Sequence, residues 1–218
     1  MVIFGNSDWA DMAHFYLTHD SPREVAAFTV DADHLSQTEH RGLPVVAFEE
    51  VGEHYPPEGF QMFPPISYKE EMNHFRTDRY NAAKQRGCIL VSYVSSKATT
   101  WPDFECGDNC FILEDNTVQP SVKIGSNVVI WSGNHPGHHS EIKDPVTITS
   151  GVVLSGHCTI ESYCFLGVNS TIRDEVTVAR ETLVGAATRI MGDTQEFDLY
   201  ITDRTRPARV KNNELQSL

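Results

Sequence analysis

The sequence lacks the features that mark membrane and secreted proteins. Its 218 residues contain no run of eighteen apolar residues, so we expect no membrane-spanning helix. Residues 1–5 are not a charged segment followed by a long apolar core, which argues against a secretory signal peptide. The sequence therefore predicts a cytoplasmic protein with no membrane partner.

Cysteine is scarce and has no spacing typical of metal or redox sites. The chain holds five cysteines, an odd number, and no Cys-x-x-Cys pair. Four of them fall on inward positions of the repeat described below: Cys106, Cys110, Cys158 and Cys164. We interpret them as small packing residues rather than disulfides or metal ligands.

Basic residues are also few. The formal net charge is −13, and the first sixty residues hold eleven acidic residues against two basic ones. This excess of negative charge argues against nucleic acid and against anionic membranes as partners. An anionic ligand of this half would have to be bound by backbone N–H groups rather than by a basic patch.

Residues 94–190 carry a hydrophobic period of six. Stepping by six from Val94 to Ile190 meets seventeen positions, and fourteen of them hold Val, Ile or Leu. A helix of 3.6 residues per turn cannot keep this phase, and a hexad repeat is typical of a parallel β-helix. Three hexads close one triangular coil of about eighteen residues, and neighbouring coils pair about 4.8 Å apart. Residues eighteen apart are therefore predicted to stack.

The residues before the repeat predict a small α/β unit. Apolar runs at 2–4 and 25–30 flank a segment with helical spacing at 8–19, which together predict a β-α-β unit. The GxGxxG fingerprint is absent and only Gly5 remains of it, which disfavours a dinucleotide site. A mononucleotide or nucleotide-sugar site at the helix N-terminus and a plain packing domain both stay open.

A second helix is predicted over residues 68–86, with Gly87 as its C-cap. The strand at 88–92 leads directly into the repeat, which places a domain boundary near residue 93. The basic residues of the helix are predicted to form a solvated face: Arg76, Arg79, Lys84 and Arg86.

A group of histidines lies within the repeat. His135, His138 and His139 fall within five residues, and His157 lies eighteen residues after His139, so these two are predicted to stack at one corner. Gly156 is predicted to stack over His138. Three interpretations compete: a general base, since imidazole titrates near neutral pH; a zinc site; and surface histidines that stack in an interface.

The repeat resembles that of the hexapeptide-repeat acyltransferases, in particular the branch of sialic-acid O-acetyltransferases and bacillosamine N-acetyltransferases. The segments that carry the resemblance are GNHPGHHS at 133–140, LSGH at 154–157 and FLGVNSTI at 165–172. The resemblance implies a left-handed coil and a homotrimer with active sites between coils. It also implies acyl transfer from CoA to an amino or hydroxyl group of a nucleotide-linked sugar.

The resemblance also implies roles in catalysis. His138 corresponds to the catalytic base, and Gly156 corresponds to a residue whose backbone N–H lies near the acyl carbonyl. His135 is a second candidate base, and His157 completes the predicted set. In the bacillosamine enzymes an acid follows the base and orients it, whereas this chain has a histidine there. The candidates for the orienting role are His139, Glu141 and Asp144.

Acetyl-CoA or a longer acyl-CoA is expected in a groove between two coils, and no metal cofactor is expected. Small residues at stacked corners would let the pantetheine arm approach the backbone: Gly156, Gly167, Gly185, Ala186 and Ala187. Basic residues expected near the CoA phosphates are Arg189, Arg206, Arg209 and Lys211. A bulky residue at Gly167 is expected to block CoA while sparing the fold.

In this family a truncated Rossmann-like unit holds the nucleotide. The corresponding positions in this chain are Gly5, Asn6, Ser7, Asp31 and Asp33. We therefore expect a nucleotide-sugar-binding domain at 1–92, a β-helix acyltransferase domain at 93–193 and a tail at 194–218. Two alternatives stay open: a zinc enzyme of the γ-carbonic-anhydrase type, and a non-catalytic trimeric module that binds a sugar nucleotide.

Overall fold

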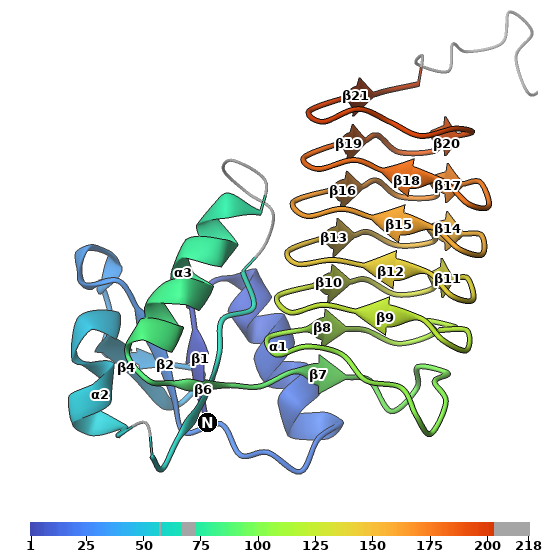
Figure 1. Cartoon of the computed structure of the whole chain (residues 1–218). Coiled ribbons are helices and arrows are strands. Elements are labelled where there is room, and N and C mark those ends of the chain that lie inside the picture. The colour runs from blue at the N-terminus through green and yellow to red at the C-terminus, as the bar shows by residue number, and fades with distance from the viewer. Residues whose placement is uncertain (57, 67–72, 203–218) are drawn as a thin grey trace, which may run out of the picture.

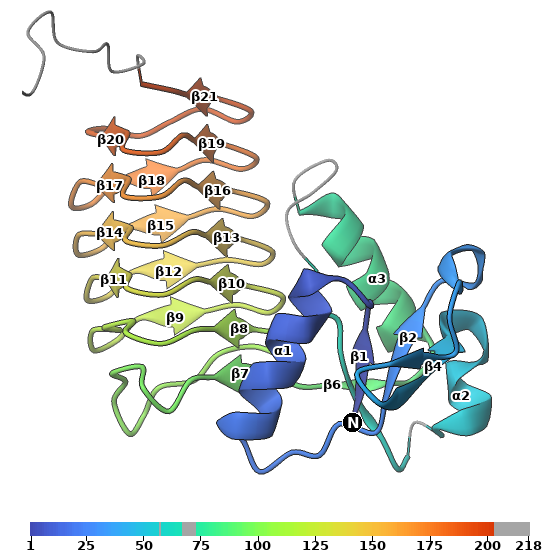
Figure 2. The ribbon, with the colours of Figure 1, turned by 180° about the vertical axis from the view of Figure 1, so that it is seen from behind.

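The computed structural model describes residues 1–56, 58–66 and 73–202. It consists of an α/β unit beside a tall stack of very short strands (Figure 1). Viewed from behind, the α/β unit still lies against one side of the lower coils (Figure 2). None of the helices in these ranges has the length and apolar character that a membrane crossing requires.

The α/β unit is built on a six-stranded sheet of order β3-β4-β2-β1-β5-β6. The strands are β1 (Val2–Phe4), β2 (Ala27–Val30), β3 (Glu39–His40), β4 (Leu43–Ala47), β5 (Gln61–Phe63) and β6 (Ile89–Leu90). Neighbouring strands are parallel except β3 and β4, which are antiparallel. The predicted β-α-β unit is confirmed, because β1 and β2 pair in parallel on either side of a connecting helix.

Helices cover both faces of this sheet. The helices are α1 (Asp8–His19), α2 (Val51–His54) and α3 (His74–Gln85), with 3-10 turns η1 (Ala32–His34) and η2 (Phe48–Glu50). The predicted bounds of α1 are confirmed. The second predicted helix is confirmed in its described part, while residues 67–72 lie outside the described ranges. Gly87 ends it with a φ of +77°, and its N–H donates to the Lys84 carbonyl over 2.9 Å.

Three parallel sheets form the sides of the coil. One contains β7 (Tyr93–Val94), β8 (Phe111–Ile112), β10 (Val129–Ile130), β13 (Thr147–Ile148), β16 (Phe165–Leu166), β19 (Leu183–Val184) and β21 (Leu199–Tyr200). The second contains β11 (His135–Pro136), β14 (Val153–Leu154), β17 (Thr171–Ile172) and β20 (Arg189–Ile190). The third contains β9 (Lys123–Ile124), β12 (Glu141–Ile142), β15 (Thr159–Ile160) and β18 (Thr177–Val178).

The register of these sheets confirms the predicted parallel β-helix. Val129 of β10 pairs with Thr147 of β13, and His135 of β11 pairs with Val153 of β14. Both offsets are eighteen residues, as three hexads per coil require. The large aliphatic positions of the hexads, such as Ile142, Ile160 and Ile172, are fully buried in one continuous core. All five cysteines are free thiols.

The α/β unit packs against the sheet of the coil that begins with β7. The buried face of α1, with Ala10, Ala13 and Leu17, forms a shared core with Phe111 of β8 and Val129 of β10. The sheet that contains β11 lies on the side of the coil away from the α/β unit (Figure 1).

Arg76 of α3 is buried, which contradicts the prediction that the basic residues of the second helix form a solvated face. Its side chain is only 1% exposed. The guanidinium donates to the Thr147 hydroxyl (3.0 Å), the Asn127 carbonyl (3.1 Å) and the Val146 carbonyl (3.2 Å). Burial lowers the pKa of Arg76 to about 10. The prediction was wrong here because α3 packs on the coil as well as on its own sheet, and its contact surface meets backbone acceptors.

The coil continues past the predicted boundary at residue 193. Strand β21 pairs with β19, with Leu183 opposite Leu199, and this pairing adds one further rung. The predicted phosphate contacts Arg206, Arg209 and Lys211 fall on residues 203–218, which lie outside the described ranges.

Candidate active site

One corner of the coil carries the predicted histidines. The corner follows β11 and its stacked counterparts, and it is formed by three two-residue turns eighteen residues apart: 138–139, 156–157 and 174–175. Backbone hydrogen bonds join these turns, because the His157 N–H donates to the His138 carbonyl over 2.8 Å. His139 and His157 have φ values of 58° and 55°. Histidine tolerates this left-handed conformation better than most residues with a side chain.

The imidazole rings of three histidines are in contact at this corner. The contact between His139 and His157 confirms the stacking that their eighteen-residue spacing predicted. Those two rings are stacked, with centroids 4.9 Å apart and planes 15° from parallel. The His138 ring meets both edge-on, at centroid distances of 5.4 Å to His139 and 5.1 Å to His157. Nδ1 of His138 lies 3.2 Å from Nδ1 of His139. All three side chains are exposed.

Gly156 is the position that lets His138 fold back onto the coil. A Cβ placed on Gly156 would lie 2.4 Å from Cε1 and 2.6 Å from Nε2 of His138, well inside van der Waals contact. The same Cβ would lie 2.9 Å from an Asp174 carboxylate oxygen. The His138 ring therefore lies against the Gly156 backbone, and Asp174 approaches the same point from the next coil.

Asp174 is a site residue that the sequence interpretation missed. It lies thirty-six residues after His138, which is two coils, so the same stacking rule that paired His139 with His157 could have found it. Its exposed carboxylate adds negative charge beside the imidazoles.

Of the three residues proposed to orient His138, His139 is the one placed against it, through the Nδ1–Nδ1 contact. Glu141 lies in β12, and Asp144 lies in the following turn, where its carboxylate approaches Gly125. The backbone N–H of His138 donates to Oε1 of Gln119 over 2.9 Å, which fixes the start of the turn.

His135 lies outside the three-histidine corner. It is half-buried in β11, three residues before His138, and pairs with Val153. This position on the flat side of the prism separates it from the three stacked turns. Its predicted role as a second base stays a prediction.

Of the described residues predicted to bind CoA, Gly156 lies at the histidine corner, and the others lie at or near the opposite edge of the sheet that contains β11. Ala186 and Ala187 are exposed turn residues at that edge, and Arg189 is exposed in β20. Gly167 and Gly185 precede stacked turns there. Their contact with CoA stays a prediction.

The expectation that a bulky residue at Gly167 would spare the fold is wrong. A Cβ on Gly167 would lie 2.6 Å from the Ala186 nitrogen and 2.7 Å from the Val184 carbonyl oxygen. These are backbone atoms of the next rung, which cannot move without separating the coils. Gly167 therefore faces the stack, and its small size serves coil packing.

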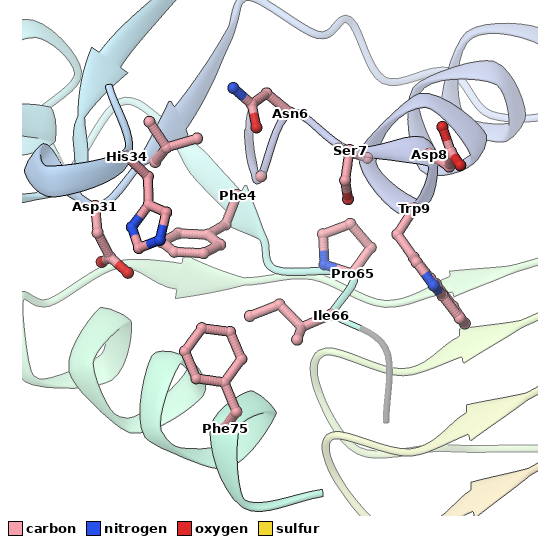
Figure 3. Close-up of a pocket in the computed structure, with 13 residues that line it drawn as sticks. Phe4, Asn6, Ser7, Asp8, Trp9, Asp31, His34, Pro65, Ile66 and Phe75 are labelled. Atoms are coloured by element: carbon pink, nitrogen blue, oxygen red, sulfur yellow. The ribbon is translucent and has the colours of Figure 1, made fainter. Parts of the chain in front are cut away.

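A cavity of about 750 Å³ lies in the α/β unit, where β1 and β2 end. Four of the five predicted substrate residues line it: Gly5, Asn6, Ser7 and Asp31. Figure 3 shows that the polar residues Asn6, Ser7 and Asp31 line the cavity together with the apolar side chains of Phe4, Ile66 and Phe75. Asp33, the fifth predicted residue, does not line the cavity; it is exposed in η1.

The local geometry of the cavity follows from the loop after β1. Gly5 has a φ of +105°, which favours glycine. Ser7 occupies the N-cap position of α1 without making a side-chain capping hydrogen bond. Asp31 accepts a hydrogen bond from Nη1 of Arg79 over 2.7 Å, so this carboxylate is paired with a cation of α3.

The fold and these residues define a parallel β-helix with an exposed histidine corner, and the repeat resembles that of the hexapeptide-repeat acyltransferases. Comparison with known proteins confirms this resemblance. No protein-family profile matches the chain. The chain is similar to acyl-(acyl-carrier-protein)–UDP-N-acetylglucosamine O-acyltransferases from several organisms. It is 27% identical to that of Paracoccus denitrificans over 77 residues, 35% of this chain and 30% of that protein.

The second such relative is from Gloeothece citriformis, with 31% identity over 96 residues, 44% of this chain and 34% of that protein. The chain thus spans about a third of the length of the curated relatives it matches.

Solved structures that cover nearly the whole chain include two with bound ligands. The acetyltransferase domain of PglB from Neisseria gonorrhoeae, in complex with acetyl coenzyme A, superposes with a TM-score of 0.79 at 19% identity, covering 91% of this chain and 93% of that chain. PerB from Caulobacter crescentus, in complex with CoA and GDP-perosamine, gives a TM-score of 0.78 at 22% identity, covering 91% of each chain. These likenesses show that the chain shares their fold.

Proposed function

We propose that the protein is an acyltransferase that moves an acetyl or other acyl group from acyl-CoA to an amino or hydroxyl group of a nucleotide-linked sugar. The observation that carries the proposal is the exposed His138 imidazole held against Gly156 at a stacked turn of the coil. The likeness to folds solved with acetyl coenzyme A and with CoA plus GDP-perosamine supports the choice of co-substrates. An acyl-CoA donor would be consistent with a cytoplasmic location.

In the proposed reaction His138 acts as general base. The sugar nitrogen or oxygen attacks the thioester carbonyl carbon directly, and its proton passes to a ring nitrogen of His138. The carbon–sulfur bond then breaks and CoA leaves as the thiolate, which takes up a proton. His139 would orient the imidazole of His138 through the Nδ1 contact.

Gly156 is proposed to stabilise the negative charge that develops on the acyl oxygen. In the described part of the chain, its N–H donates to no other backbone group, which leaves it available to an acyl carbonyl. A preorganised N–H donor at this point would act when charge develops in the transition state. No nucleophilic residue of the enzyme is required, because the sugar itself attacks.

We propose that the α/β unit is a Rossmann-like domain whose cavity holds the nucleotide. The N-terminus of α1 offers free N–H groups and a partial positive charge to the phosphates beside Asn6 and Ser7. Asp31 follows the second strand, where a carboxylate can accept hydrogen bonds from ribose hydroxyls. This arrangement suits a chain with few basic residues in its first sixty positions.

We propose a homotrimer of left-handed coils with the active site shared between copies. The sharing is inferred because, within one chain, the sheet that begins with β7 packs on the α/β unit, whereas the histidine corner joins the other two sheets of the coil. A sugar held in the cavity of one copy would reach His138 of another copy, and acyl-CoA would lie in the groove between coils. The proposed domains are the α/β unit at 1–92 and the coil from residue 93, which extends beyond the expected end at 193 to include β21 (Leu199–Tyr200).

The first test is acyl transfer itself. Purified protein is incubated with acetyl-CoA and a panel of amino-sugar and plain-sugar nucleotides, and both the free thiol and the acylated sugar are measured. Transfer to one acceptor would establish the reaction and identify the sugar. Absence of transfer to every acceptor, with acetyl-CoA, longer acyl-CoAs and all nucleotide classes tried, would contradict the proposal. A binding module would bind a sugar nucleotide without transfer.

A mixing experiment tests the shared site. His138→Ala removes the base and Asn6→Trp fills the cavity, so each variant alone is expected to be nearly inactive. Hybrid trimers reassembled from an equal mixture contain copies in which an intact cavity faces an intact His138. Recovery of a measurable fraction of wild-type turnover supports the shared site, whereas an inactive mixture of verified hybrids would contradict it.

A further inference from the structure

The three-histidine corner offers more than one proton acceptor. One ring nitrogen from each of His138, His139 and His157 lies within 4.8 Å of the other two. We propose that this corner binds a divalent transition-metal ion of the zinc class, and that the bound ion switches off acyl transfer. The binding rests only on the geometry of the corner, while the inhibition rests on the proposed function.

The spacing of the nitrogens fits zinc with small adjustments. Zinc binds imidazole nitrogens at about 2.0–2.1 Å, so two ligands of a tetrahedral ion lie about 3.3–3.4 Å apart. The Nδ1 atoms of His138 and His139 are already 3.2 Å apart. The His157 ring is stacked on His139, and because its side chain is exposed a side-chain rotation can bring its nitrogen closer.

Backbone hydrogen bonds fix the positions of the three residues, so their placement does not depend on contacts between the imidazole rings. The His157 N–H donates to the His138 carbonyl and the His139 N–H to the Pro120 carbonyl, so the ladder of the coil fixes all three Cα positions. The fourth coordination position faces solvent, because all three side chains are exposed. On the next coil Asp174 and Glu175 are exposed carboxylates, and their charge favours a cation at this corner.

Metal binding would remove the base. A neutral imidazole has one lone pair for a proton or a metal, because its other nitrogen carries hydrogen. If Nδ1 of His138 coordinates the ion, the remaining ring proton resides on Nε2, and neither nitrogen can accept a proton from the sugar. The ion would thus inhibit the reaction, because it occupies the lone pair of His138 that would otherwise accept the proton of the sugar. It would not be a cofactor of the reaction.

The first experiment measures binding and needs no activity. Protein without a polyhistidine tag is dialysed against zinc, and bound metal is determined; cobalt replaces zinc to report tetrahedral geometry by its visible absorption. We expect one ion per chain. His139→Asn and His157→Asn are each expected to weaken zinc binding by about 100-fold or more. Removing a residue that only supports a metal ligand already lowers metal affinity by about 10- to 100-fold, and removing the ligand itself should cost at least as much.

The variants are chosen to keep the fold. Asparagine tolerates the left-handed conformation of residues 139 and 157, and thermal melting verifies that the coil is intact. His135→Asn is the matched control, because this histidine lies on the same coil outside the corner, and it should bind zinc as the wild type does. Absence of binding, equal binding by all variants, or one ion per three chains would overturn the single-chain site.

The second experiment tests the inhibition. The acylated sugar is measured directly, because zinc also binds the free CoA thiol. Zinc is expected to inhibit the wild type reversibly, and in His157→Asn the half-inhibiting concentration should rise by the same factor as the dissociation constant. An active enzyme that binds zinc at the corner and keeps full turnover would overturn the switch. Stoichiometric zinc in a protein inactive with every acceptor would contradict the proposed function and leave the metal site standing.

Discussion

Gly156→Ala tests the catalytic geometry with one added methyl group. The new Cβ would lie 2.4 Å from Cε1 of His138, about 1 Å short of the 3.4 Å at which ordinary van der Waals contact begins. The obstructing atoms belong to the end of an exposed side chain, so the imidazole moves and the coil does not. No left-handed φ is recorded for Gly156, and alanine can therefore adopt its backbone conformation.

A displacement of this size is large for proton transfer. Misplacing a reacting group by about 1 Å can reduce the rate by about 10²-fold, which corresponds to about 2.7 kcal/mol in the activation barrier. We therefore expect Gly156→Ala to lose about 10²-fold in turnover while its melting temperature stays close to that of the wild type. Gly192→Ala is the matched control. It lies two coils above Gly156 in the same column, and a Cβ there meets no atom within 4 Å.

A double variant shows whether the methyl group acts through the base. If it does, Gly156→Ala should cause little further loss in a His138→Ala background, because the imidazole that it displaces is already absent. Additive losses would place the effect at the acyl carbonyl, where the Gly156 N–H is proposed to act. Wild-type turnover in Gly156→Ala would refute the placement of the base against this glycine.

Three further predictions concern the base, the junction and pH. His138→Ala should lower turnover by about 10²- to 10⁴-fold with unchanged CoA affinity in a binding titration; unchanged turnover would remove His138 from its role. Arg76→Ala should lower the free energy of unfolding by about 3 kcal/mol or more, since buried acceptors lose a charged donor; denaturant unfolding measures this, and a loss no larger than that of partly exposed Arg79→Ala would contradict it. Hydrogen bonds, first of all from the Ser96 hydroxyl, hold the pKa of Asp20 well below its usual range. The stability advantage of the wild type over Asp20→Asn should therefore be complete above the ordinary carboxyl pKa near 4 and be lost as pH falls below it; an advantage independent of pH would contradict this.

The coil could be predicted because its sequence pattern and its geometry have the same period. Each hexad places one aliphatic side chain inward, so the buried positions recur at every sixth residue. Because three hexads make one coil, residues that stack on neighbouring coils are eighteen positions apart in the sequence. The contact between His139 and His157 follows from that offset without any further information. The position of Asp174 follows equally, by counting two coils instead of one.

The junction could not be predicted, because it depends on how two separately patterned units meet. Arg76 reads as a surface residue in a basic helix, and nothing local indicates that carbonyl groups of residues 127 and 146 will lie opposite it. The same holds for Asp33, which follows β2 as Asp31 does but lies in η1 outside the cavity. The expected tolerance of a bulky residue at Gly167 was wrong for a related reason: whether a small residue is packed against the next rung can be seen only in the coordinates.

In the proposed trimer, the shape of the prism would link assembly to chemistry. A coil has three sides, and the α/β unit covers the side that begins with β7, through α1 and through Arg76 of α3. The histidine corner lies between the other two sides of the coil. Under the proposed shared site, a monomer would present a nucleotide cavity without the His138 base that serves it. If the proposed reaction is correct, dissociation of the assembly should abolish turnover even though every residue of the site remains folded.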